Sequence, residues 1–274
     1  MIGFYSMGLS MVNNINNLTN RNSILIARLS SGRRINSAAD DPAGLSISKK
    51  MEAQIRGLRM AQRNVQDGIS LIQTAEGAMN EIHSMLQRMN EIAVESANGT
   101  YTDDDRANLN LEFEELKKGI TDIVSNTEFN TKKLIDGSQQ ANGIHIQTGA
   151  NSGNNLEIKI NNVDITSLNL DTVDISTQVN AQDAISKVQD AVDFVSLQRS
   201  SLGAKQNRLE HTLNNLSNYE MNLTASMSRI TDTDMAKAMM EFTKNQIILQ
   251  ASQAVMAQFM KMEQDRVRAL LSSL

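Results

Sequence analysis

The chain has 274 residues, which is enough for one or two domains, and its composition is unusual for a compact globule. Aromatic residues make up 3%, and there is one proline, no tryptophan and no cysteine, which favours long helices packed through aliphatic side chains and excludes disulfides and thiolate metal sites. A formal net charge of −5 argues against a nucleic-acid-binding surface, and no apolar run is long enough to predict a membrane span.

A polar segment of mostly small residues separates two long helical patterns. It covers residues 29–48 and reads LSSGRRINSAADDPAGLSIS. Pro42 suits the first position of a helix, because its missing N–H costs nothing there. Asp41 can cap the exposed amides, and Asp40 and Asp41 together suit the positive end of the helix dipole. We predict a joint at Asp40, Asp41 and Pro42, although these residues alone fit an ordinary interhelical turn equally well.

After the proline, apolar residues recur at a mean spacing of about 3.5 residues, which is the coiled-coil period. This pattern predicts one helix over residues 43–97. Gly57, Gly68 and Gly77 lie inside it, and they either allow a close approach of a neighbouring helix or are tolerated strain. The predicted buried row is Met51, Ile55, Leu58, Ala61, Val65, Ile69, Ile72, Ala75, Met79, Ile82, Leu86, Met89 and Ala93.

A second helix is expected from about Thr102 to Asn126, with Thr102 as its cap and three aspartates in its first turn. The aspartates are better explained as a solvated, dipole-favoured first turn than as a cation site, because the loop spacing of calcium motifs is missing. Its apolar row is Leu109, Phe113, Leu116, Ile120 and Ile123.

Residues 137–175 differ from the rest, since they are rich in glycine, asparagine, serine and threonine. Apolar and polar residues alternate over 144–148 and again over 156–160, with turn residues between the two runs. This pattern predicts a β-hairpin near 144–160, the only strand pair that we expect.

A third apolar row begins near Ala181 and ends at Ile230, where a short polar joint, residues 230–234, follows. The last helical stretch runs to Leu274. We interpret it as an assembly helix, in which Phe242, Leu249 and Met256 recur at intervals of seven. The members of the third row are Ile185, Val188, Val192, Val195, Leu202, Leu209, Leu213, Leu216, Leu223, Met227 and Ile230.

These elements predict a mainly α fold: a long antiparallel coiled-coil helix bundle with a small β-hairpin, plus terminal helices that pair as a second segment. Residues 1–40 with 235–274 would form the terminal-helix core segment. Residues 41–234 would form a helical rod segment.

The sequence shows no catalytic or metal-binding motif. The three histidines, His83, His145 and His211, are isolated, so we expect neither an enzyme nor a cofactor or metal site. Arg88 and Ile92 share one helix face beside the buried row, which suits a protein interface. An incidental exposed isoleucine explains the same pattern.

Long stretches at both ends of the chain resemble bacterial flagellins. The segment at 29–48 resembles their N-terminal signature, as do residues 54–100 and NTEFNTKKLIDG at 126–137. IHIQTGAN at 144–151 is similar to the flagellin β-hairpin, and residues 198–258 resemble the C-terminal family segment.

The resemblance implies a secreted structural protein that polymerises with itself into the flagellar filament. In flagellins the terminal helices form the inner tube, the paired long helices form the next layer, and surface domains follow the hairpin. The stretch between Ile160 and Ala181 is too short for a surface domain, so the chain resembles a minimal flagellin.

Export is implied through the flagellar type III apparatus, as an unfolded chain without signal cleavage. The first residues agree with this route, because they have no basic start and no clear cleavage site. Implied partners are an export chaperone on residues 235–274 and the filament cap and junction proteins.

Many flagellins are also recognised by the innate immune receptor TLR5. The family's contact pattern corresponds to Arg88, Ile92 and Glu115 here, with Gln87 and Glu91 nearby, so we expect receptor or inter-subunit contacts at these residues. Three alternatives stay open: a minor flagellin, a secreted receptor ligand or adhesin, and a hook–filament junction protein. The last is disfavoured because junction proteins usually carry a larger central insert.

Overall fold

The computed structural model describes residues 2–139 and 143–271, and only the backbone of residues 2–5 and 269–271. The fold is mainly helical, as the sequence predicts, with 74% of residues in helices. In chain order the elements are α1 (Ile2–Ser31), α2 (Pro42–Ser96), α3 (Asp103–Asn126), β1 (Glu128–Phe129), β2 (Lys132–Lys133), β3 (Ile144–Gln147), β4 (Asn155–Ile158), α4 (Gln178–Thr231) and α5 (Met235–Leu271).

The chain forms two compact units. The terminal unit contains residues 1–53 and 222–274, and the central unit contains residues 54–221. These boundaries fall inside α2 and α4, whereas the expected boundaries lay at residues 40/41 and 234/235. The difference arises because backbone hydrogen bonds tie the segments around both joints together, including one from Arg34 N–H to the Thr231 carbonyl at 2.6 Å.

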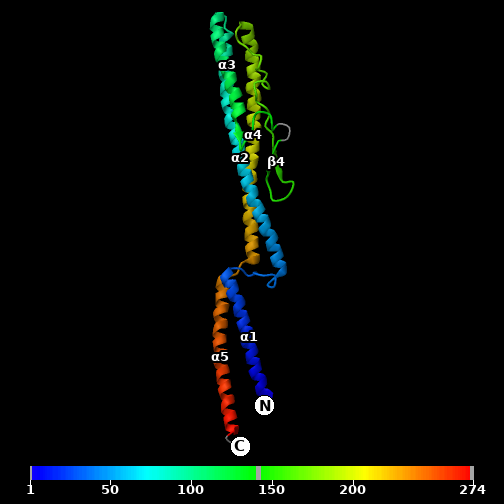
Figure 1. Ribbon diagram of the computed structural model, residues 1–274, viewed down its shortest axis with the longest axis vertical. Coiled ribbons are helices and arrows are strands. Elements are labelled where there is room, and N and C mark those ends of the chain that lie inside the picture. Colours follow the sequence, from blue (N-terminus) through cyan, green and yellow to red (C-terminus); the bar gives the residue numbers. More distant parts are fainter. Residues whose placement is uncertain (1, 140–142, 272–274) are drawn as a thin grey trace. The chain divides into compact units, whose positions relative to one another are not determined.

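Helices α2, α3 and α4 run alongside one another in the central unit (Figure 1). Met85 of α2 lies against Gly119 of α3, and Arg59 of α2 forms an ion pair with Glu220 of α4 at 2.6 Å. Burial of apolar side chains drives this packing. The apolar row predicted for α2 is buried except at Met51 and Ile69, which are half-buried.

Helix α3 begins with a reciprocal cap. The Thr102 hydroxyl accepts the Asp105 N–H, and the Asp105 carboxylate accepts the Thr102 N–H at 3.1 Å. Arg106 is buried in the next turn, where its Nε donates to the Ser96 carbonyl at 2.9 Å and its Nη2 donates to the Asn98 carbonyl at 3.0 Å. Arg106 thus satisfies the Ser96 carbonyl in the last turn of α2, where carbonyls have no partner within their own helix.

The expected hairpin is present, with Ile144 opposite Ile158 and Gln147 opposite Asn155. It packs on α2 at two glycines. A Cβ on Gly57 would lie 2.8 Å from the Ala150 Cβ, and one on Gly68 would lie 3.2 Å from Ile146 Cγ1. Both glycines therefore allow a close approach. The neighbour of Gly57 is the hairpin turn, whereas a Cβ on Gly68 would also lie 3.4 Å from Leu209 Cδ1 of helix α4, as the interpretation of a neighbouring helix held.

A second, shorter hairpin joins β1 and β2, with Glu128 opposite Lys133. Our expectation of a single strand pair was wrong here. The turn residues Asn130 and Thr131 both have positive φ, 50° and 66°, as a tight two-residue hairpin turn requires. Two-residue strands are too short for an alternating pattern to predict them.

The segment from Ile160 to Gln178 is anchored along its length. Val163 N–H donates to the Ile135 carbonyl at 3.1 Å, the buried Ser96 hydroxyl donates to the Ile175 carbonyl at 2.6 Å, and the buried Lys117 ammonium donates to the Val173 carbonyl. The apolar side chains of this segment, from Ile160 to Ile175, are buried. The segment thus completes the core of the central unit.

Candidate assembly interface

Helices α1 and α5 pair through one face each in the terminal unit (Figure 1). The two helices approach each other at Gly8, where an added Cβ would lie 3.2 Å from the Phe259 ring. Phe242, Leu249 and Met256, expected on the assembly helix, are all half-buried. Each recurs at a seven-residue interval, so these three residues lie on one side of α5.

Both helices also carry large apolar side chains that remain uncovered. On α5, Met240 is 66% exposed and Ile247 is 62% exposed. This many exposed large apolar side chains on two helices exceeds the scattered singles of an ordinary monomer surface. The exposed set is Met7, Leu9, Val12, Ile24 and Ile26 on α1, with Met235, Met239, Met240, Ile247, Ile248, Val255, Met260, Met262 and Val267 on α5. We call this set the terminal apolar surface.

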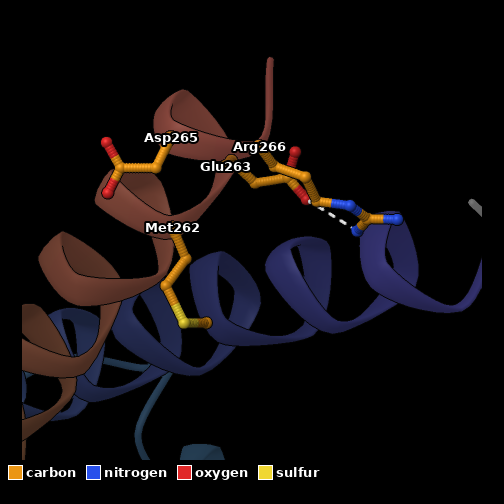
Figure 2. Close-up of a pocket in the computed structure, with 4 residues that line it drawn as sticks. All are labelled: Met262, Glu263, Asp265 and Arg266. Carbon is orange, nitrogen blue, oxygen red and sulfur yellow. Dashed lines mark ion pairs between the residues drawn. The ribbon is translucent and has the colours of Figure 1, made fainter. Parts of the chain in front are cut away.

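Hollows lie beside this surface. Figure 2 shows one beside the last turns of α5, lined by Met262, Glu263, Asp265 and Arg266. The Met262 side chain points toward α1, and Glu263 and Arg266 form a long ion pair at 4.0 Å. An exposed ion pair of this kind contributes little stability, so the apolar side chains dominate here.

The two joints are hydrogen-bonded to each other. Arg33 and Asp232 form an isolated β-bridge, and the Thr233 N–H donates to the Gly32 carbonyl at 3.0 Å. The Arg34 guanidinium donates to the Ile230 carbonyl through Nη2 at 2.7 Å. A cation on the last carbonyls of α4 also suits the negative end of that helix. The exit from α1 and the exit from α4 are thus held as one structure.

The joint residues Asp40, Asp41 and Pro42 build the start of α2. The Asp40 carboxylate accepts the Ser37 N–H at 2.9 Å and the Asn36 N–H at 3.1 Å. These bonds, with that from Ser37 foremost, hold the pKa of Asp40 below its ordinary value of 3.8. Asp41 directly precedes helix α2, which starts at Pro42. Its carboxylate accepts the Gly44 N–H at 2.9 Å.

The residues expected to make receptor or inter-subunit contacts do not all share one surface. Gln87, Arg88, Glu91 and Glu115 are exposed. Ile92 is 0% exposed, which corrects the expectation that it lies at an interface. Ile92 lies at the edge of the apolar row, and periodicity alone does not tell whether a residue at that edge is buried or exposed.

Arg88 links two helices at this surface. Its Nε donates to Glu112 of α3 at 2.8 Å, and its Nη1 donates to Glu91 of α2 at 3.1 Å. The hydrogen bond to Glu112, followed by that to Glu91, raises the pKa of Arg88. On the same two helices, Leu111 is 67% exposed and Val94 is also exposed, and neither residue was predicted from the sequence to lie on a surface. Leu111 does not fit the spacing of the apolar row, to which its neighbours Leu109 and Phe113 belong, so the pattern gave no signal for it.

Residues 2–139 and 143–271 contain no group of three or more acidic, histidine or cysteine side chains placed to bind a metal ion. Within the same residues, no helix is both long and apolar enough to cross a membrane. A long helical fold with an apolar surface on its paired chain ends defines a structural protein that assembles with other chains.

The sequence comparisons identify the family. Residues 2–140 match the bacterial flagellin N-terminal helical region, and residues 185–270 match the bacterial flagellin C-terminal helical region. The chain belongs to the bacterial flagellin family. This family is structural and not enzymatic, and the chain is a subunit of the flagellar filament, which lies outside the cell.

Individual relatives agree with this assignment. The chain is 54% identical to a flagellin of Halalkalibacterium halodurans, over 84% of this chain and 85% of that protein. It is 43% identical to a flagellin of Bacillus subtilis, over 96% and 98% respectively. The crystal structure of Bacillus cereus flagellin is 32% identical, with a TM-score of 0.52 over 56% of this chain and 88% of that one. The chain is of minimal size, consistent with no large central domain.

Proposed function

We propose that the two units divide the work of the filament subunit. The terminal unit is completed only when neighbouring subunits cover it, whereas the central unit reaches its fold within one chain. The observation that carries this proposal is the contrast in burial. The predicted apolar row of α2 is almost wholly covered by its own chain, and the terminal apolar surface is not.

The energy in the terminal apolar surface is large enough for this role. Burying one leucine-sized side chain contributes on the order of 1.5–3 kcal/mol. Several such side chains on each helix therefore offer a driving force that a single chain leaves unused. Their burial offsets the entropy lost when the ends become ordered.

Substitution on α5 tests this role. Ile247→Gln removes apolar area from a side chain that is 62% exposed. We expect it to raise the subunit concentration needed to elongate filament fragments by about tenfold, since about 1.4 kcal/mol corresponds to that factor. Elongation is followed by light scattering and electron microscopy.

Gln250→Ala, an exposed polar position on the same helix, is the matched control and leaves elongation unchanged. An Ile247→Gln chain that elongates fragments at the unchanged concentration would contradict the role of this surface.

The same surface suits the partners expected during export. An apolar helix that is uncovered before assembly needs protection in the cell, so we place an export chaperone on residues 235–274. Export as an unfolded chain through the flagellar type III apparatus fits ends that gain stability only on assembly. Filament cap and junction proteins then meet the terminal helices at the two ends of the polymer.

A second candidate function is recognition by TLR5. It is favoured by the exposed Gln87, Arg88, Glu91 and Glu115, which present charged groups from α2 and α3. Two acceptors hold the Arg88 guanidinium in place, and a fixed guanidinium is typical of protein recognition surfaces.

Arg88→Ala separates the two functions. We expect lost or strongly reduced signalling in a receptor reporter cell line, together with normal elongation of filament fragments. Arg63→Ala, which removes another exposed arginine of α2, is the control and should signal normally. Full signalling by Arg88→Ala would rule out this contact.

A further inference from the structure

A buried asparagine lies in the pairing face of α1. Asn22 is 7% exposed, and its side-chain Oδ1 accepts no hydrogen bond. From Gly8 to Leu25, the other half-buried or buried positions of the helix are a glycine or apolar side chains. A buried amide oxygen without a partner costs stability, so an asparagine at this position calls for a physical reason.

The contact between Gly8 and Phe259 fixes how α1 and α5 are aligned. Counted inward from it along these antiparallel helices, each step of three or four residues on α1 is matched by the same step on α5. By this count, the buried and half-buried positions of the two helices fall at the same levels: Met11 with Met256, Ile15 with Ser252, Leu18 with Leu249, Asn22 with Asn245, and Leu25 with Phe242.

We propose that Asn22 and Asn245 form a polar layer that specifies this alignment of α1 with α5. Each side-chain amide has both donors and an acceptor, so one amide can satisfy the other. A single polar layer in an apolar helix pair selects one register at a cost in stability.

Other alignments are disfavoured by the same two residues. A shift of one heptad places Asn22 level with Ser252 or Ala238, and Asn245 level with Leu29 or Ile15. In either direction, Asn245 meets an aliphatic side chain and loses its amide partner. Asn22 and Asn245 belong to one chain, so partial pairing of α1 with α5 before assembly is enough to test the alignment without a polymer.

Cysteine pairs test the alignment, because the natural chain has no cysteine. The level pair is Met11→Cys with Met256→Cys, and the offset pair is Met11→Cys with Leu249→Cys. Disulfide formation in glutathione buffer gives the effective concentration of each pair, even when the helices are paired only part of the time. We expect a several-fold higher value for the level pair. An offset pair that equals or exceeds it would overturn the alignment.

A double-mutant cycle on the level pair tests the polar layer. Asn22→Leu and Asn245→Leu are introduced singly and together, and the effective concentration is measured again. We expect the change in effective concentration in the double variant to exceed the product of the changes in the two single variants by about fivefold, as for side chains in direct contact. Asn20→Leu, an exposed asparagine of α1, combined with Asn245→Leu is the control and should multiply simply. If the effects of Asn22→Leu and Asn245→Leu on the effective concentration simply multiply, the proposal of a polar layer is wrong.

Discussion

One carboxylate organises the turn before α2. Asp40 accepts two backbone N–H groups and the Ser37 hydroxyl, and its pKa is lowered as a result. A carboxyl group with a lowered pKa stabilises the fold above its ordinary pKa, and that contribution is lost as the pH falls through the folded value. The turn therefore depends on a charge that strong acid removes.

We expect the Ser37 amide to lose protection against hydrogen exchange as the pH falls from neutral to well below 3.8, the ordinary pKa of Asp40, after correction for the intrinsic rate. Asp40→Asn should show the weaker protection already at neutral pH, because a neutral amide oxygen is a poorer acceptor than a carboxylate. Protection of the Ser37 amide that is equal at both pH values would contradict this role.

At the scale of elements, the helical glycines differ in what surrounds them. Gly57 lies beside Ala150, whereas nothing lies within 4 Å of a Cβ added at Gly77. Gly77→Ala should raise the free energy of unfolding by about 0.5–1 kcal/mol, because alanine has the better helix propensity.

Gly57→Ala is its matched counterpart. A new Cβ would meet the Ala150 Cβ at 2.8 Å, so the hairpin turn must move away. We expect a loss of about 1–3 kcal/mol in urea unfolding of the full chain. Equal effects of the two substitutions would show that the hairpin does not depend on close packing at Gly57.

The elements also show what a sequence can predict. Long rows at a constant spacing, such as that from Ile55 to Ala93, predicted α2, and Thr102 with its aspartates predicted the start of α3. The predictions were incomplete where contacts between distant segments determine whether a residue is buried or where a segment lies. Ile92 is buried although it lies at the edge of the apolar row, and the segment after Ile160 is held by Lys117 and Ser96 from other elements. Local periodicity carries no record of such contacts.

At the scale of the whole chain, the two units differ in how their apolar side chains are covered. Residues 54–221 contain a covered core with its own hairpin and anchored segment, and the paired ends leave apolar side chains uncovered. On the proposed division, a chain of this kind can fold its central unit alone and still polymerise. The energy of polymerisation comes from surface that no single chain buries.

Removal of about 35 residues from each end tests this division most directly. The truncated and full-length chains are compared by circular dichroism and by elongation of filament fragments under the electron microscope. We predict that the full chain elongates the fragments, and that the truncated chain stays soluble, helical and monomeric. A truncated chain that elongates fragments, or one that loses its helical structure, would contradict the account.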